Sequence, residues 1–128
     1  MKWKILLLAL PALLITGCAG TFTNLTPLQQ ARNANNSYPV EVAFTSPETT
    51  LRWDSIRPYV LVNSQLYEMH STPLMTNRWE GFVPAMPGDN AVTYRYKFDY
   101  DYNSFSAQPK RSSVFSPQYH LQIIEPQQ

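Results

Sequence analysis

Hydrophobic and polar positions alternate along much of the chain after residue 37, and the longest alternation runs from residue 92 to residue 102. Threonine, arginine, lysine and aspartate separate its apolar positions, so that every second side chain can point to one face. A period of two is typical of a β-strand that is buried on one side. The predicted buried face consists of Val92, Tyr94, Tyr96, Phe98, Tyr100 and Tyr102.

Shorter stretches predict further strands, at 38–45, 49–53, 59–62, 65–69, 78–84 and 119–124, of which 59–62 is apolar on both faces and is expected to be central. Asn63-Ser64 predicts a hairpin between two of them, and residues 86–90 predict a turn. Short strands at this spacing, in a chain with eleven prolines, predict an all-β fold: a single antiparallel β-sandwich of about seven strands. We expect this domain to occupy 38–124, followed by a short tail at 125–128.

The chain begins differently, with two lysines and then an eleven-residue apolar run at 5–15. A membrane-spanning helix needs roughly 20 such residues, so the run favours a cleaved signal peptide. The residues that follow, Thr16-Gly17-Cys18, resemble the end of a bacterial lipoprotein signal. That resemblance implies removal of 1–17 and attachment of lipid to Cys18, the only cysteine. The alternative is an ordinary signal peptide in which Cys18 has no role.

Residues 18–37 are mostly small and polar, and we expect them to form a flexible, lipidated tether. Inside this segment, Thr26-Pro27-Leu28-Gln29 combines a helix-capping residue, a proline at the first helical position and a glutamine that can cap in return. The pattern predicts at most about two turns of helix over 27–34. Because Ala19 rather than aspartate follows the cysteine, the lipoprotein resemblance implies sorting to the outer membrane if the cell is Gram-negative.

The charge and cysteine composition of the chain limits the kinds of partner and stabilisation that we expect. Without the first 17 residues the chain retains eight basic and nine acidic residues. They form no basic stripe, so nucleic acid is not an expected partner. A single cysteine cannot form an internal disulfide, and the fold must therefore rely on a packed core.

The second half of the chain carries a more specific pattern. Residues 79–84 read Trp-Glu-Gly-Phe-Val-Pro, Pro87-Gly88 follows, and 94–98 read Tyr-Arg-Tyr-Lys-Phe with Asp101 beyond. This region resembles the immunoglobulin-like early-set domains, which include glycogen-binding modules and the N-terminal domains of starch-branching enzymes. The resemblance implies an immunoglobulin-like sandwich. Glycogen-binding modules hold sugar with two tryptophans and the lysine of the Tyr-Lys-Phe strand, and of these only the lysine, Lys97, is present here.

Lys97, Tyr100 and Tyr102 are the candidate ligand contacts. Within the stripe, Tyr100 and Tyr102 lie past the expected core and are the better candidates for exposure; exposed beside Lys97, their rings could stack on a sugar. Ser104 stands where the glycogen-binding pattern has one of its tryptophans. The favoured interpretation of the tyrosine stripe is one face of the sandwich core, with hydroxyl groups that reach its edge. Trp53 and Trp79 are predicted core residues.

Asp99-x-Asp101-x-Asn103 is similar to the start of a calcium loop. Ser104 takes the place of the glycine that such a loop needs, and Lys110 takes the place of its closing glutamate. No metal site and no cofactor are therefore predicted.

Catalytic motifs are not recognisable either. His70 and His120 belong to no pattern for a nucleophile, a base or a metal ligand. Glu68 and Glu80 could supply a glycosidase-type pair only if the fold set them at a suitable separation. We expect no catalytic residues and a protein that is not an enzyme.

These observations predict a membrane-anchored envelope lipoprotein that acts as a structural or protein-interaction module. Its expected partners are the lipid bilayer, through acylated Cys18, and an envelope protein. The alternative is a carbohydrate-binding module at the cell surface or in the periplasm, with a glycan as partner, and a third reading is an accessory to a periplasmic enzyme.

Overall fold

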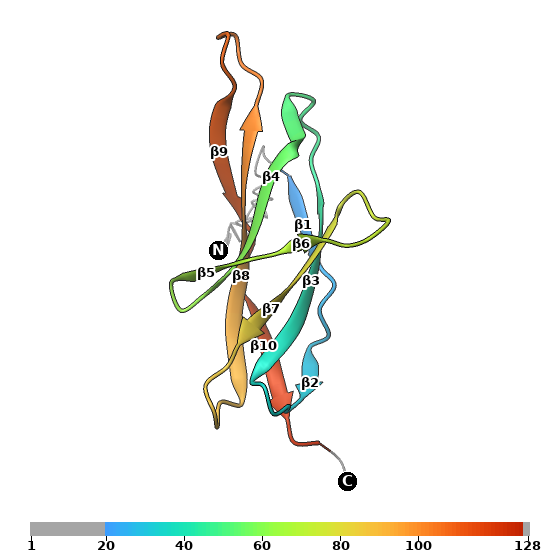
Figure 1. The fold of residues 1–128 in the computed structure, drawn as a ribbon, viewed down its shortest axis with the longest axis vertical. Coiled ribbons are helices and arrows are strands. Elements are labelled where there is room, and N and C mark those ends of the chain that lie inside the picture. Colours follow the sequence, from blue (N-terminus) through green and yellow to red (C-terminus); the bar gives the residue numbers. More distant parts are fainter. Residues whose placement is uncertain (1–19, 127–128) are drawn as a thin grey trace, which may run out of the picture.

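The computed structural model describes residues 20–126 and contains ten β-strands and no helix in that range (Figure 1). The strands are β1 (Thr21–Asn24), β2 (Gln29–Ala31), β3 (Ser37–Thr45), β4 (Leu51–Val62), β5 (Gln65–Glu68), β6 (His70–Ser71), β7 (Arg78–Pro84), β8 (Ala91–Tyr102), β9 (Lys110–Phe115) and β10 (Tyr119–Ile124). The predicted lipid site, Cys18, and the signal peptide at 1–17 lie outside the described residues.

The strands form two sheets. The smaller sheet has the order β1-β3-β7-β6 and the larger has the order β2-β10-β8-β4-β5, with β9 also paired to β8. β10 pairs with the first part of β8 and β9 with its second part, so β9 and β10 together act as one interrupted last strand. This order is that of an immunoglobulin-like sandwich. The predicted all-β sandwich is therefore confirmed, although it has more strands than expected and β2 pairs with β10 in parallel.

The core lies between the two sheets and follows the predicted alternation. The inner face of β8 buries Val92, Tyr94, Tyr96, Phe98 and Tyr100, and β3 contributes Tyr38, Val40, Val42 and Phe44 from the opposite sheet. The rings of Phe98 and Trp79 meet edge to face, with 4.9 Å between their centroids. Such contacts add to the stabilisation that burial of apolar area provides.

The N-terminal segment is part of the sandwich, and the prediction of a flexible tether over 18–37 is wrong for its described part. β1 pairs with β3 in the smaller sheet, and β2 pairs with β10 in the larger one. The centroid of the Phe22 ring lies 4.9 Å from that of Phe44 and 5.0 Å from that of Phe98. The predicted helix over 27–34 is also wrong, because extended pairing of Gln29–Ala31 with β10 replaces it.

A cluster of hydrogen bonds anchors this segment to the core. The side-chain amide of Asn24 donates to the Tyr94 hydroxyl at 2.8 Å, and the Tyr96 hydroxyl donates to Asn24 Oδ1 at 2.7 Å. Thr26 Oγ1 lies 3.1 Å from the Tyr96 hydroxyl and accepts a hydrogen bond from the Glu41 N–H at 2.9 Å. Burial raises the pKa of Tyr96 far above its ordinary value, so this hydroxyl remains a donor. Polar residues that suggested a tether are therefore satisfied inside the fold.

The hairpin between β4 and β5 confirms the prediction made from Asn63-Ser64. Both residues have positive φ, 49° and 66°, and Val62 pairs with Gln65. Two consecutive residues with positive φ form the two-residue turn whose twist matches that of paired strands.

No helix long and apolar enough to cross a bilayer occurs within 20–126.

Candidate functional site

The structure does not bring Lys97, Tyr100 and Tyr102 together. Lys97 lies on the outer face of β8, whereas Tyr100 lies on the inner face and is 3% exposed. Tyr102 is partly buried against the core, and its ring is tilted by 54° from that of Tyr100. The stripe thus forms one face of the core, as the favoured interpretation had it, and the suggested exposure of Tyr100 and Tyr102 beside Lys97 is wrong. Residues separated by an odd number of positions on a strand point to opposite faces.

Different aromatic residues surround Lys97. The strand register places Tyr59 of β4 on one side of it and Phe115 of β9 on the other. Lys97 Nζ lies 6.0 Å from the centroid of each of these rings. The guanidinium of Arg95 lies 4.5 Å from the centroid of Phe115, within the range of a cation–π contact.

Apolar residues extend this group across the larger sheet. Leu61 of β4 is in register with Arg95 on one side and with Leu66 of β5 on the other. Phe115 is 46% exposed and Leu66 is 45% exposed. We call the group the cation–aromatic surface; it consists of Tyr59, Leu61, Leu66, Arg95, Lys97 and Phe115.

Ion pairs border this surface farther along β8. Lys97 Nζ lies 3.0 Å from Asp99 Oδ1, and Ser113 donates a hydrogen bond of 2.6 Å to the same oxygen. Partial burial by itself raises the pKa of Asp99, but the hydrogen bonds from Ser113 and Lys97 and the charges of Lys97 and Arg57 outweigh it and lower the pKa. Asp99 is therefore ionised at neutral pH.

Asp101, in the middle of the pattern that is similar to a calcium loop, is also paired with cations. Its Oδ1 lies 3.5 Å from Arg57 Nη2 and 3.8 Å from Arg111 Nε. Within residues 20–126, no three histidine, cysteine, aspartate or glutamate side chains gather as a metal site would require. The histidines lie apart, His70 on β6 of the smaller sheet and His120 on β10 of the larger.

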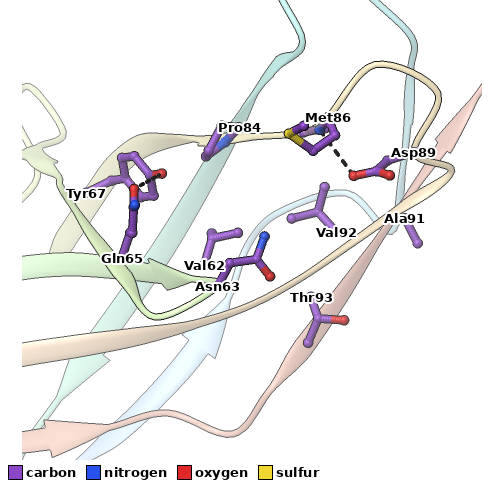
Figure 2. A pocket seen from close by; sticks show the side chains of 11 residues that line it. Val62, Asn63, Gln65, Tyr67, Pro84, Met86, Asp89, Ala91, Val92 and Thr93 are labelled. Carbon is purple, nitrogen blue, oxygen red and sulfur yellow. Dashed lines mark hydrogen bonds between the residues drawn. The ribbon is translucent and has the colours of Figure 1, made fainter.

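A hollow of about 450 Å³ lies at one end of the sandwich, between the β4–β5 hairpin and the β7–β8 turn. Figure 2 shows Tyr67 and Gln65 on one side of it and Met86 and Asp89 on the other. The Tyr67 hydroxyl donates to Gln65 Oε1 at 2.9 Å, and Asp89 accepts from the Met86 N–H at 3.1 Å. These polar groups already have partners, so the hollow is a weaker candidate than the cation–aromatic surface.

A second hollow, of about 460 Å³, lies toward the opposite end beside Trp53. Trp79 is buried as predicted, but Trp53 is 41% exposed, and its predicted place in the core is wrong. The pairing of β4 with β8 shifts register between Arg52 and Arg57. This irregularity disturbs the alternation of side chains and turns Trp53 partly toward solvent.

Sequence reasoning found Lys97 but missed its neighbours. Tyr59 and Phe115 are 38 positions before and 18 positions after Lys97 in the chain, and only the register of β4, β8 and β9 brings them together. One signal in the sequence did indicate this site: Arg95 and Lys97 occupy the outward-facing positions of a strand whose other face is aromatic.

No model of a known protein family matches the chain, and no curated protein matches it. The chain is similar to one chain of a solved structure, which concerns the structural basis of T cell specificity and activation by the bacterial superantigen toxic shock syndrome toxin-1. The TM-score of this match is 0.42 and the sequence identity is 13%. The match covers 83% of this chain and 100% of the other. A similarity at this level supports no functional inference.

Proposed function

We propose that this chain is a lipid-anchored protein of the bacterial cell envelope, acylated at Cys18, and that its sandwich binds another protein through the cation–aromatic surface. The exposure of Phe115 and Leu66, 46% and 45%, beside Arg95 carries this proposal. Aromatic residues and arginine are enriched in protein interfaces and dominate their binding energies. Neighbouring exposed apolar side chains are also typical of interaction sites.

The charges of this surface indicate the chemistry of the partner. Lys97 and Asp99 neutralise each other, but Arg95 forms no ion pair among residues 20–126. A guanidinium can donate two parallel hydrogen bonds to a carboxylate while its plane rests on an aromatic ring. We therefore expect the partner to present a carboxylate next to apolar side chains.

The edge of the sheet supports the same location. In the described part of the chain, β9 pairs with β8 alone, so its other edge has no strand beside it. Phe115 is the last residue of β9. Backbone groups at such an edge can pair with an extended segment of a partner.

Site-specific crosslinking tests this proposal directly. A photoreactive phenylalanine analogue is placed at Phe115, and a matched one at Phe82, which is 60% exposed on β7 of the other sheet. Crosslinking in intact cells is expected to capture one defined envelope protein from position 115 and not from position 82. Phe115→Ser should weaken co-purification from detergent-solubilised membranes at least about fivefold, while Phe82→Ser should not. Equal capture at both positions would contradict the proposed surface.

A glycan is the alternative occupant, because two aromatic rings beside one cation are also a typical sugar-binding arrangement. The same surface is tested by affinity electrophoresis in gels that contain polysaccharide. Retardation that disappears in both Tyr59→Ala and Lys97→Ala would replace the protein partner with a carbohydrate.

The anchor is tested separately. Mass spectrometry of the mature protein is expected to show a lipid-modified N-terminal cysteine at position 18, and Cys18→Ser should release the protein from membranes. An unmodified Cys18 would remove the anchor and leave the binding surface to be judged by crosslinking.

A further inference from the structure

The position of Gly20 determines which end of the sandwich faces a lipid on Cys18. β1 begins where β3 ends, since Thr21 pairs with Thr45. Gly20 packs so closely on Thr45 and Phe44 that a side chain there would collide with both. Two residues of extended chain reach at most about 7 Å. Any lipid on Cys18 must therefore enter the bilayer close to this end.

Three loops surround the point where the chain leaves. The β3–β4 loop is joined to the β8–β9 loop by a hydrogen bond of 2.8 Å from the Asn103 N–H to the Thr50 carbonyl. The β6–β7 loop is joined to β3 by a bond of 3.0 Å from the Phe44 N–H to the Asn77 carbonyl. In Figure 1 the β8–β9 loop is at the top, the β6–β7 loop projects to the right, and the start of β1 lies between them.

These loops carry exposed apolar side chains. Phe105 in the β8–β9 loop and Leu74 in the β6–β7 loop, at 113% and 103%, are the most exposed large hydrophobic residues in the described chain. Trp53 and Met75 add partly exposed surface at the same end. Water solvates such side chains poorly, so their exposure on loops at the end where the chain leaves indicates a non-aqueous contact.

Leu74 also has an unusual backbone. The Met75 N–H donates to the Thr72 carbonyl at 3.1 Å, which closes a turn with Pro73 in its second position. Leu74, in the third position, has φ 66°. Such a turn favours glycine or asparagine there, because a Cβ atom is strained at positive φ. A strained leucine with a fully exposed side chain indicates a role other than stabilising the turn.

We propose that Phe105, Leu74, Met75 and Trp53 insert into the bilayer interface and fix the orientation of the anchored sandwich. This inference rests on the proposed acylation of Cys18, which brings these side chains to the membrane. Lys110 and Arg111 are exposed at the base of the β8–β9 loop, where Arg111 also lies 3.8 Å from Asp101. Their charges complement anionic headgroups, and apolar side chains beside cations are typical of interfacial membrane contacts.

Tryptophan fluorescence tests the proposed insertion on the acylated protein. The protein is reconstituted in phosphatidylethanolamine–phosphatidylglycerol vesicles whose acyl chains carry bromine, which quenches tryptophans that reach the hydrocarbon. Trp53 should be quenched, with buried Trp79 as a constant background. In a Trp53→Phe protein, a reporter introduced by Phe105→Trp should be quenched, and one introduced by Met86→Trp should not. Met86 follows β7 at the opposite end of the sandwich and is 67% exposed.

Matched variants measure the contribution of the loops. Leu74→Asn suits the backbone of the turn, and together with Phe105→Ser it should shift the ratio of inserted to free orientations by at least about tenfold and restore Trp53 fluorescence. Met86→Ser combined with Leu28→Asn, at two other exposed apolar positions, should leave the quenching unchanged.

The possible failures are distinguishable. If the lipidated protein floats with vesicles but Trp53 and the reporter at 105 are quenched no more than the reporter at 86, the insertion is refuted while the anchor stands. If mass spectrometry shows no lipid on Cys18, the proposed anchor falls and the insertion falls with it.

Discussion

On its inner face β8 buries Tyr94, Tyr96 and Phe98, whereas on its outer face it presents Arg95, Lys97 and Asp99, which remain partly exposed. The inner side chains contact residues of both sheets and exclude water. The outer side chains contact only neighbours in their own sheet and solvent. One strand therefore separates the two roles: its inner face determines stability, and its outer face is available for recognition.

The largest effect is expected on the inner face. Phe98→Ala removes a ring that contacts Phe22, Phe44 and Trp79. A cavity among rings from β1, β3 and β7 should lower the free energy of unfolding by about 3–5 kcal/mol. Urea denaturation of the unacylated Cys18→Ser chain measures this, and a loss below about 1 kcal/mol would show that the inner face is less tightly packed than described.

A smaller loss is expected where the N-terminal segment meets β8. Thr26→Val keeps the shape of the side chain but leaves the Glu41 N–H and the Tyr96 hydroxyl without the threonine oxygen. The Tyr96 hydroxyl keeps its hydrogen bond to Asn24, but the Glu41 N–H loses its partner, and this loss should cost about 1–3 kcal/mol in the same assay. Thr21→Val, at an exposed position of β1, is the control and should stay within about 0.5 kcal/mol.

On the outer face, a substitution should affect partner binding more than it affects the free energy of unfolding. Arg95→Ala should change the free energy of unfolding by less than about 0.5 kcal/mol, because the guanidinium is partly solvated. It should weaken partner capture at least about fivefold, as measured by co-purification. A variant that loses stability but keeps capture would place Arg95 among the structural residues instead.

The smallest effect is expected at Asp99 and depends on pH. Its pKa is lower in the folded protein than the ordinary value of 3.8, so its ionised form stabilises the fold above that pH, and the contribution is lost as pH falls through the folded pKa. Solvent screens this pair, so Asp99→Asn should cost less than about 1 kcal/mol at pH 7. Stability curves of the two proteins should converge below pH 3.8, and a constant difference at all pH values would exclude charge as its cause.

The two faces also differ in how far the sequence predicts them. The alternation over 92–102 predicts the inner face of β8, because burial of one side imposes a period of two. It could not predict that Asn24 and Thr26 anchor the N-terminal segment to the core, since each side chain bonds a tyrosine 70 residues later. Their polarity alone suggested a tether.

For the candidate site, the sequence identified Lys97 but paired it with the wrong tyrosines. Tyr100 followed the alternation and is buried, while Tyr59 and Phe115 became neighbours of Lys97 only through strand register. Trp53 departed from expectation because β4 shifts register beside it. Local patterns predict faces, whereas register depends on how distant strands meet.

The way β1 joins the smaller sheet has a mechanical consequence. Four residue pairs connect β1 to β3, and hydrogen bonds in an antiparallel pair run perpendicular to the strands. A pull along β1, transmitted from an acylated Cys18, would strain all of these bonds simultaneously in shear, not peel them apart one after another. The pairing of β2 with β10 attaches the N-terminal segment to the other sheet as well. If the proposed anchor and partner are correct, this pairing geometry should resist tension between them better than a strand that could peel away.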